Sequence, residues 1–501
     1  MEPPVVLDPR RWRALAFICL AQLMVVLDGT VVNIALPNAK ADLNISDANQ
    51  QWVITAYALA FGGLLLFGGR LADMWGRRRT LMVGLVGFAA ASALGGAAVS
   101  QEMLFGARAL QGAFGALLAP AVLSLLTVMF ATPSERARAF GIFGAIAGGG
   151  AALGLILGGL LTQMLDWRWT MYINVPVAVV ALLGVILEIK EPPKLGNQPI
   201  RLDVLGVVLA GSGLALIVYG FSRAAEEGWG DGGTIASLIA AVVLLAAFVG
   251  WQMRCRYPLL PLRVILDRAR GGAYLSVGLS TIAMFGSFLF LTLYMQNVHH
   301  YSPLSAGFAF LPMVFGMLIG STQIAARLIT RVPPRLLIVP GALIGAVGML
   351  FLSQISADST RYWSVILPGL FLVGCGMGTV FMTTINLATF GVESRDAGVA
   401  SAMVNTSQQV GGAVGTALLN TIAANAAASY ITDHSGSIHG PADIPAMRML
   451  AMVHGESVGF MIAAAILGLV AVVAGFLINL RKPIGAGQEA PSPEPARTVS
   501  E

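Results

Sequence analysis

One carboxylate lies in a stretch of the sequence where a charge is costly. Asp28 is near the middle of an apolar run from Ala14 to Pro37, which at 24 residues is long enough to cross a lipid bilayer with some tilt. A carboxylate at mid-membrane costs about 2.5–3.5 kcal/mol on insertion scales, so a partner or a proton has to offset its charge. Ionisable residues inside membrane segments usually mark ion or proton pathways, which makes Asp28 the first candidate functional residue.

A second charged residue, Arg108, lies inside a later apolar run and also needs a partner. Two interpretations follow. Asp28 could take up and release protons during a transport cycle, or the two residues could form a purely structural ion pair. We favour the first, and we expect no other ionisable side chain deep in a span. Asp203 and Glu188 lie near span ends, where we expect them to reach the surface.

The composition is that of a protein whose main solvent is lipid. Of 501 residues, 56% are hydrophobic and only 11% are charged, against about 25% charged in soluble domains. The net charge of +5 does not indicate nucleic-acid binding, because the basic residues are spread over short loops and form no patch. The three cysteines have no metal-ligand spacing, and we expect reduced thiols and no metal or other cofactor.

Fourteen apolar segments are long enough to span a membrane, and lipid requires them to be helices. The first follows three arginines, as a signal peptide would. Its apolar run is too long and no small-residue cleavage site follows, so we interpret it as an uncleaved span. The segments are roughly 14–37, 51–70, 80–99, 103–129, 139–163, 169–189, 203–222, 233–252, 271–297, 304–326, 336–354, 362–390, 398–426 and 454–480.

The loop charges predict that both termini are cytoplasmic. With the N-terminus inside, the cytoplasmic segments hold 24 Lys and Arg residues and the external loops hold five. A miscount of one span would remove this asymmetry, which therefore supports an even number of spans. We expect the tail, 481–501, to be a disordered cytoplasmic segment, and the longest external loop, 427–453, is polar.

The first cytoplasmic loop, residues 68–80, reads GGRLADMWGRRRT. It resembles the signature loop of the major facilitator superfamily, which governs conformational gating. Glycine permits a tight turn between antiparallel helices, and the aspartate can accept hydrogen bonds from a helix N-terminus across the bundle interface. We expect the arginines to lie at anionic lipid headgroups. The matching residues are Gly69, Asp73, Gly76, Arg77 and Arg78.

Two further stretches narrow the resemblance. The stretch 105–116, FGARALQGAFGA, resembles the fourth-helix motif of the superfamily, whose arginine, here Arg108, is linked to proton transfer. The stretch 141–159 has the glycine spacing of the antiporter members, although Leu155 stands where those members have a proline. Close helix packing through small residues would explain the same glycines by itself. They are Gly141, Gly150, Gly154, Gly158 and Gly159.

The sequence around Asp28 and the stretches 166–176, 291–312 and 405–420 are similar to the fourteen-span drug:proton antiporters of this superfamily. The resemblance covers about residues 14–480 and is looser in the C-terminal half. It implies an all-α polytopic membrane protein with the major facilitator fold, in which two six-helix bundles rock around a cavity near mid-membrane.

The implied bundles are 14–189 and 271–480, and the region 190–270 contributes two extra central transmembrane helices. Polar side chains at plausible depths are candidates for the substrate cavity, although each could equally form a hydrogen bond between helices. These candidates are Asn33, Tyr57, Gln111, Gln296, Asn297, Asn405 and Gln409.

The resemblance implies proton-coupled export of amphipathic drugs or secondary metabolites across a bacterial cytoplasmic membrane. No phosphate-binding loop ending in Gly-Lys-Ser/Thr occurs, so ATP is not used by that route. A facilitator or importer of a small organic nutrient is the alternative with the same fold, and the antiporter glycines argue against it. A membrane enzyme would need clustered acids, histidines or metal ligands, which the sequence lacks. Protons, membrane lipids and a small amphipathic substrate are the expected partners, and an adaptor protein is left open.

Overall fold

The computed structural model describes residues 9–46, 49–130, 132–190, 202–357, 361–434 and 443–480, and in these ranges the chain is helical without strands. The predicted tail 481–501 lies outside the described residues. Thirteen helices in the described part are long and apolar enough to cross a membrane. A further continuous helix of 32 residues, α5 (Pro133–Met164), occupies the position of the predicted span 139–163. The prediction of an all-α membrane protein is confirmed.

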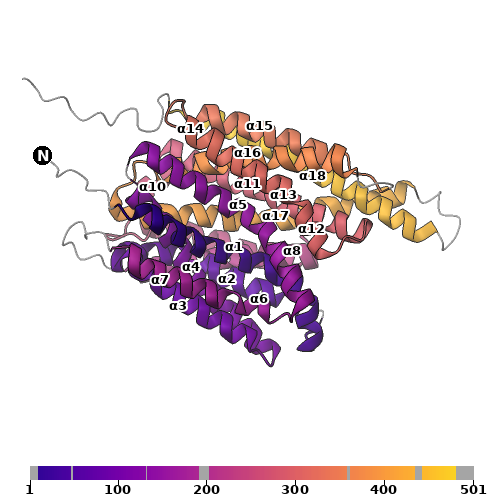
Figure 1. The fold of residues 1–501 in the computed structure, drawn as a ribbon, viewed down its shortest axis with the longest axis horizontal. Coiled ribbons are helices and arrows are strands. Elements are labelled where there is room, and N and C mark those ends of the chain that lie inside the picture. The colour runs from indigo at the N-terminus through magenta and orange to yellow at the C-terminus, as the bar shows by residue number, and fades with distance from the viewer. Residues whose placement is uncertain are drawn as a thin grey trace, which may run out of the picture.

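The N-terminal helices form one half of the molecule, coloured indigo to purple in Figure 1. Within this half α1 packs on α5 and α7, while α4 packs on α2 and α3. The predicted sixth span is interrupted at Ile173, which separates α6 from α7. The helices are α1 (Arg11–Asp42), α2 (Trp52–Trp75), α3 (Arg77–Gly96), α4 (Gln101–Met129), α5, α6 (Trp169–Tyr172) and α7 (Asn174–Glu188).

The C-terminal helices form the other half, coloured orange to yellow in Figure 1, and α5 lies along the boundary against α12, α13 and α16. Three spans contain π-helical segments, which sequence periodicity did not predict. The elements are α10 (Leu262–Leu266), α11 (Arg268–Leu293), η1 (Tyr294–Val298), α12 (Pro303–Ala309), α13 (Leu311–Leu318), η2 (Ile319–Ala325), α14 (Ala326–Leu328), α15 (Arg335–Leu352), η3 (Tyr362–Ile366), α16 (Leu367–Thr389), η4 (Ser394–Asp396), α17 (Ala397–Asp433) and α18 (Asp443–Leu477).

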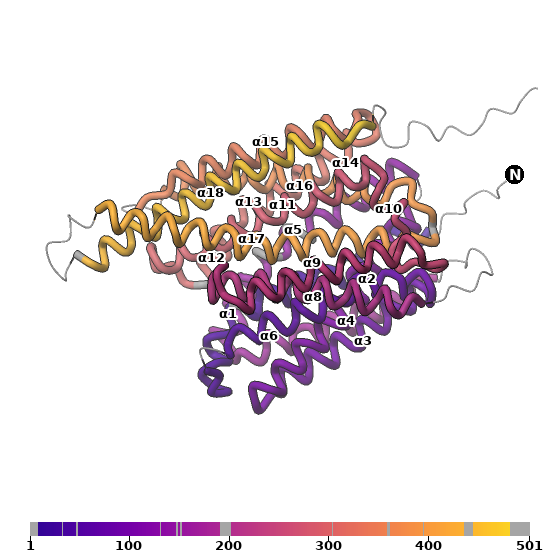
Figure 2. Tube along the Cα trace, turned by 180° about the vertical axis from the view of Figure 1, so that it is seen from behind, coloured from indigo at the N-terminus to yellow at the C-terminus, as the bar shows by residue number. Residues whose placement is uncertain are grey.

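The two inserted helices, α8 (Val204–Glu227) and α9 (Gly232–Gln252), lie against the line where the halves meet (Figure 2). They pack on each other, and α8 contacts both α2 and α17. A Cβ on Gly63 would lie 3.1 Å from the carbonyl oxygen of Gly211, so the missing side chain lets α2 and α8 approach closely. The Trp229 indole donates a 2.9 Å hydrogen bond to Thr421 of α17.

The expectation that Asp203 reaches the surface is wrong. Asp203 is 7% exposed and caps α8 by accepting a 2.8 Å hydrogen bond from the Gly206 backbone N–H. It also accepts hydrogen bonds of 2.8 Å from Trp251 and 2.7 Å from Gln252, both on α9. Its position near a span end was visible in the sequence, but the two donors come from a helix that only the fold brings beside it.

Candidate transport site

Asp28 lies at the centre of a buried polar network between α1, α4 and α7. It is 1% exposed, and its Oδ2 accepts a 2.6 Å hydrogen bond from Arg108 Nη1. Its Oδ1 accepts hydrogen bonds of 3.0 Å from Gln111 Nε2 and 2.9 Å from Asn174 Nδ2. Three donors therefore satisfy both carboxylate oxygens, as a buried ionised carboxylate requires.

Arg108 is held from two further sides. Its Nε donates to the Val53 carbonyl oxygen at 3.1 Å, and its Nη1 donates to Gln111 Oε1 at 2.8 Å. The guanidinium carbon lies 4.5 Å from the centre of the Tyr57 ring, within the range of a cation–π contact. The arginine thus connects the Asp28 carboxylate of α1 to the backbone and an aromatic face of α2.

Two members of this network were not predicted. Asn174 lies 146 positions from Asp28 in the chain. Ser92 of α3 accepts a 2.6 Å hydrogen bond from Gln111 Nε2. The only signal for Asn174 was its place in the stretch 166–176, which resembles the antiporters. No pattern in the sequence pointed to Ser92, because a serine in a Gly- and Ala-rich helix is common packing material.

The glycines of α5 pack against the part of α1 that carries Asp28. A Cβ on Gly150 would lie 2.9 Å from Val26 Cγ1, and one on Gly158 would lie 3.1 Å from Ile34 Cδ1. A Cβ on Gly154 would overlap the Thr30 hydroxyl. Close helix packing is therefore what these glycines achieve, and their role in antiport stays a prediction.

The remaining two glycines of the motif are placed differently. Gly141 faces the other half of the molecule, where a Cβ would lie 3.1 Å from the Cβ of Ala326. Gly159 is buried next to Gly158. The motif thus runs from the boundary between the halves, at one end of α5, to the α1 contact beside Asp28.

The signature loop joins the two halves through Asp73. Its Oδ1 and Oδ2 accept hydrogen bonds of 2.9 Å and 3.2 Å from the backbone N–H groups of Gly398 and Val399, in the first turn of α17. The expected hydrogen bond to a helix N-terminus is therefore present. Gly69 packs against the same turn, because a Cβ there would lie 2.5 Å from the Gly398 carbonyl oxygen. The gating role of these residues stays a prediction.

Two arginines of the loop, Arg77 and Arg78, bond to other parts of the protein. Arg77 donates to Asp73 at 3.2 Å and to Ser124 at 2.6 Å, so the expectation that it binds lipid headgroups is wrong. Arg78 donates at 3.1 Å to the Ile186 carbonyl oxygen at the end of α7, where a cation complements the helix dipole. Gly76 has a φ of +116°, which makes the turn that glycine allows.

A second link between the halves was not predicted. Arg136, at the start of α5, is buried and donates to Asn386 Oδ1 at 3.0 Å and to Thr389 Oγ1 at 2.7 Å, both on α16. Because α5 starts and α16 ends at the end of the molecule where Asp73 meets α17, both links join the halves at the same end.

The predicted substrate residues do not form one cluster. Gln111 and Tyr57 belong to the Asp28 network, whereas Gln409 of α17 donates across the boundary to the Ala58 carbonyl oxygen of α2 at 3.4 Å. Asn405 donates within its own helix, to Ser401. Gln296 and Asn297 lie in η1, and Asn33 lies in α1 with its side chain outside the described part.

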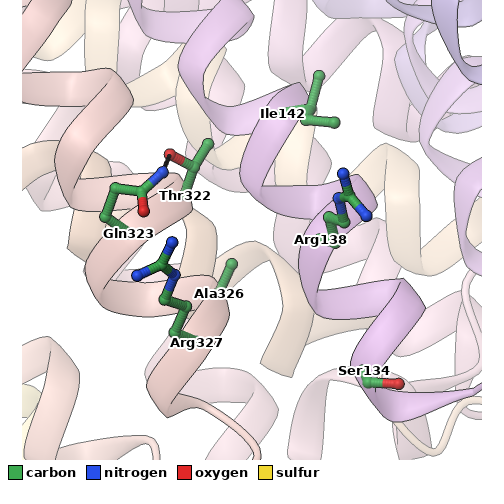
Figure 3. A pocket seen from close by; sticks show the side chains of 7 residues that line it. All are labelled: Ser134, Arg138, Ile142, Thr322, Gln323, Ala326 and Arg327. Carbon is green, nitrogen blue, oxygen red and sulfur yellow. Dashed lines mark hydrogen bonds between the residues drawn. The ribbon is translucent and has the colours of Figure 1, made fainter.

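A pocket of about 550 Å³ opens between α5 and the η2–α14 segment (Figure 3). Arg138 projects into it from α5, and Arg327 and Gln323 project from the facing element. None of the predicted substrate residues lines this pocket. It lies near the Arg136 end of α5, away from the Asp28 network, so we do not assign it to substrate.

A third ionisable side chain is buried in the bundle, which the sequence did not predict, although it lies near a span end, at the level where α15 finishes. Glu456 of α18 is 3% exposed, and neither of its carboxylate oxygens has a hydrogen-bond partner within the described ranges. It is the third residue of the predicted span 454–480, where the sequence does not distinguish a surface side chain from one inside the bundle.

Comparisons with known proteins agree with this architecture. A family model described as Major Facilitator Superfamily matches residues 18–416. The puromycin resistance protein of Streptomyces alboniger is 49% identical over 491 residues, which are 98% of this chain and 96% of that protein. The cephamycin export protein of Amycolatopsis lactamdurans is 38% identical over 455 residues, 91% of each chain.

A solved structure shares the fold at low sequence identity. The crystal structure of the human organic anion transporter MFSD10 superposes with a TM-score of 0.61 and 15% identity, covering 93% of this chain and 99% of that one. With the helical architecture described above and a family model that spans most of the sequence, the chain belongs to the major facilitator superfamily and is a membrane transporter, not an enzyme.

Proposed function

We propose that this transporter exports amphipathic antibiotics or secondary metabolites in exchange for protons, by alternating access, with Asp28 as the proton carrier. Relatives that are 49% and 38% identical are named for puromycin resistance and cephamycin export, which supports this class of substrate. Puromycin is therefore the first compound to test. The single observation that carries the proton-coupling part is the buried carboxylate of Asp28 with its three donors.

Protonation of Asp28 cannot leave this network unchanged. The ionised carboxylate accepts hydrogen bonds from Arg108, Gln111 and Asn174. A neutral carboxylic acid carries a hydrogen of its own, which would point at a donor and would no longer balance the arginine charge. Arg108 and the two amides must then reorient, which changes how α1 packs on α4 and α7. This gives a physical route from proton binding to helix movement.

The links between the halves indicate which end is closed here. Asp73 on the α17 N-terminus and Arg136 on α16 join the halves at the end where α1 begins. The 24-to-5 split of basic residues supports a cytoplasmic position for this end and for both termini, in a bacterial cytoplasmic membrane. We infer a conformation closed to the cytoplasm, in which Asp28 is ionised and waits for an external proton.

We also propose that the chain divides into two bundles that move relative to each other and a region of two inserted helices. The rocking units would be the bundles 14–189 and 271–480, and the region 190–270 would supply α8 and α9. The pocket with Arg138 and Arg327 supports contact with membrane lipids at the cytoplasmic end, since exposed arginines there attract anionic headgroups.

The test uses inverted membrane vesicles that contain the full chain. Energised vesicles should accumulate puromycin, and adding puromycin to vesicles with a preset pH gradient should move protons. Asp28→Asn removes the titratable group but presents an amide N–H₂ to one of the three donors, so folding needs a separate measurement. Size-exclusion profiles and exchange of labelled for unlabelled puromycin, which needs no proton, provide it.

The expected result is that Asp28→Asn keeps exchange of puromycin and loses uphill accumulation. Asp42→Asn, which alters a half-exposed carboxylate at the end of the same helix, is the matched control and should accumulate and exchange puromycin as the wild type does near neutral pH. Full proton-driven accumulation by Asp28→Asn would show that Asp28 and Arg108 are a structural ion pair. Puromycin movement without any proton coupling in the wild type would favour a facilitator.

A further inference from the structure

A buried carboxyl group in the C-terminal half has no role in the mechanism above. Glu456 lies 14 residues into α18 and is almost completely buried, and no described residue donates a hydrogen bond to either oxygen. Asp28 is equally buried and has three donors. In the same conformation, one buried carboxyl group therefore has three hydrogen-bond donors, and the other has none among the described residues.

The helix around Glu456 is packed on three sides. A Cβ on Gly455 would overlap the Ala423 carbonyl oxygen of α17, and one on Gly459 would overlap the Phe290 ring of α11. Ser457 donates a hydrogen bond to the Ser353 carbonyl oxygen, directly after α15. Glu456 thus lies inside the bundle formed by these helices and not on its lipid surface.

Physical chemistry restricts the charge of such a group. An ionised carboxylate without hydrogen bonds or a counter-ion costs far more to bury than the neutral acid, so the group takes up a proton instead. Glu456 is therefore in its protonated form in this conformation. A conformation that supplied water or a donor would release that proton.

The titratable neighbours lie at the same end of the C-terminal half. Tyr294 of η1 lies near Glu456, and its hydroxyl donates a 2.7 Å hydrogen bond to the Ser356 carbonyl oxygen. His299 lies beside Tyr294, with the two rings 4.8 Å apart, and its buried Nε2 has no hydrogen-bond partner among the described residues. These groups offer the donors or acceptors that a rearranged Glu456 would need.

On α17 the neighbouring titratable groups form a stack of their own. The Tyr430 ring lies 4.1 Å from that of His434 and 4.9 Å from that of His454, the residue two positions before Glu456. His454 is exposed and lies on the opposite face of α18 from Glu456. In the described part of the chain, no hydrogen bond or ion pair connects Glu456 to this stack.

We propose that Glu456 is a second proton-binding site of the transporter, located in the C-terminal half and occupied when the cytoplasmic end is closed. This inference rests on the proposed proton-coupled export. With two carboxyl groups that exchange protons in different halves, each puromycin molecule leaves against one proton more than Asp28 alone would provide.

The experiment measures the ratio of protons to substrate in proteoliposomes that contain the full chain. The membrane potential is held at zero. The largest puromycin concentration ratio across the membrane then equals the proton concentration ratio raised to the number of protons exchanged per puromycin molecule. Loss of one proton lowers this limit about tenfold for each unit of pH difference, because each pH unit is worth one factor of ten per proton. Glu456→Gln, which has the shape of the neutral acid, should show this tenfold loss while exchange of labelled puromycin continues.

Two controls separate the explanations. Glu456→Asp keeps a carboxyl group and should retain the wild-type ratio, and Glu393→Gln changes a carboxylate that is 55% exposed and should have no effect. An unchanged ratio in Glu456→Gln would overturn the proposal and leave Glu456 as a structural neutral acid. A wild type that moves no protons with puromycin would instead contradict the proposed function itself.

Infrared spectroscopy keeps the proposal testable if Glu456→Gln does not fold. A protonated carboxyl group gives a carbonyl band of its own, and the band from Glu456 should shift in Glu456→Asp. It should also weaken as the pH rises or as puromycin is added. The proposal would be overturned if the carbonyl band neither shifted in Glu456→Asp nor changed in intensity when puromycin was added.

Discussion

Arg136 of α5 and Asn386 of α16 are 250 positions apart in the chain and are joined by a 3.0 Å hydrogen bond from Nε to Oδ1. The same guanidinium reaches Thr389 at 2.7 Å, so one buried arginine ties the N-terminal half to two side chains of the C-terminal half. Together with Asp73, it adds buried polar contacts to the apolar packing that joins the halves at this end.

Replacing Arg136 by alanine should favour conformations that are open at this end. A hydrogen bond to a charged group contributes about 1.5–3 kcal/mol, so the loss of two should shift the equilibrium by more than tenfold. The measurement is the rate at which a cysteine placed at the buried Ser321, against α5, reacts with a water-soluble maleimide. Arg138→Ala, which removes an exposed arginine two positions further on, is the control, and equal rates in both variants would contradict the prediction.

Replacing Asp73 by asparagine should weaken the second link. One of the two α17 backbone N–H groups would then face an amide donor, and Arg77 would lose its counter-ion. We expect a cost of about 1–3 kcal/mol to the closed conformation and therefore faster labelling of the same cysteine. Combining the change with Arg136→Ala should add the two effects, because the sites are separate. No change in labelling would show that the loop has another purpose.

Replacing Gly154 by alanine should separate α5 from α1. The new Cβ would overlap the Thr30 hydroxyl, and overpacking of this kind typically costs about 1–3 kcal/mol. Thermal unfolding in detergent measures the loss. Thr30→Ala in the same chain should restore part of it, whereas Gly468→Ala should be harmless because a Cβ there meets nothing within 4 Å. Equal losses with and without Thr30→Ala would exclude the proposed overlap.

Asp42, which lies beyond the end of the first membrane span, should make the stability of the folded protein depend slightly on pH. A hydrogen bond from Arg168, with a second from Trp167, holds the pKa of Asp42 below its usual range. The folded state therefore binds this proton less readily than the unfolded chain. The stabilisation is present above the ordinary carboxyl pKa of about 4 and is lost as the pH falls through the lower folded value.

The measurement for Asp42 compares unfolding temperatures of the wild type and Asp42→Asn between pH 6 and pH 3. The difference should be largest at the upper end and should become smaller towards the lower end. Tryptophan fluorescence reports on the same contact, since the Trp167 indole donates to Asp42. A difference that does not change with pH would rule out the carboxylate as its source.

Much of this architecture could be predicted from the sequence, because lipid permits few solutions. Apolar runs predicted the helices, and the type and spacing of Asp73 and its glycines predicted a hydrogen bond to a helix N-terminus. Asn174, Ser92 and Arg136 could not be predicted, because their importance depends on which helix faces which. Periodicity indicates that a residue is in a span, but it does not indicate the neighbour it meets.

For Glu456, too, the sequence did not indicate which neighbours surround the side chain. A glutamate near the start of a span usually reaches water, and nothing in the surrounding sequence says that this one points inwards. Its burial follows from Gly455 and Gly459, which bring α17 and α11 close on either side. The error about Asp203 has the same cause, since its donors are on α9.

The position of α8 makes the two lipid-facing sides of the transporter different, because it covers the contact between the halves on one side only. Since α8 bridges α2 and α17, the joint between these two helices is shielded from the acyl chains. The corresponding joint on the other flank, between α5 and α13, has no such cover from α8 or α9. A bulky group tethered beside α5 and α13 should therefore slow uptake of amphipathic cargo from the lipid more than the same group beside α8, while uptake from water is spared.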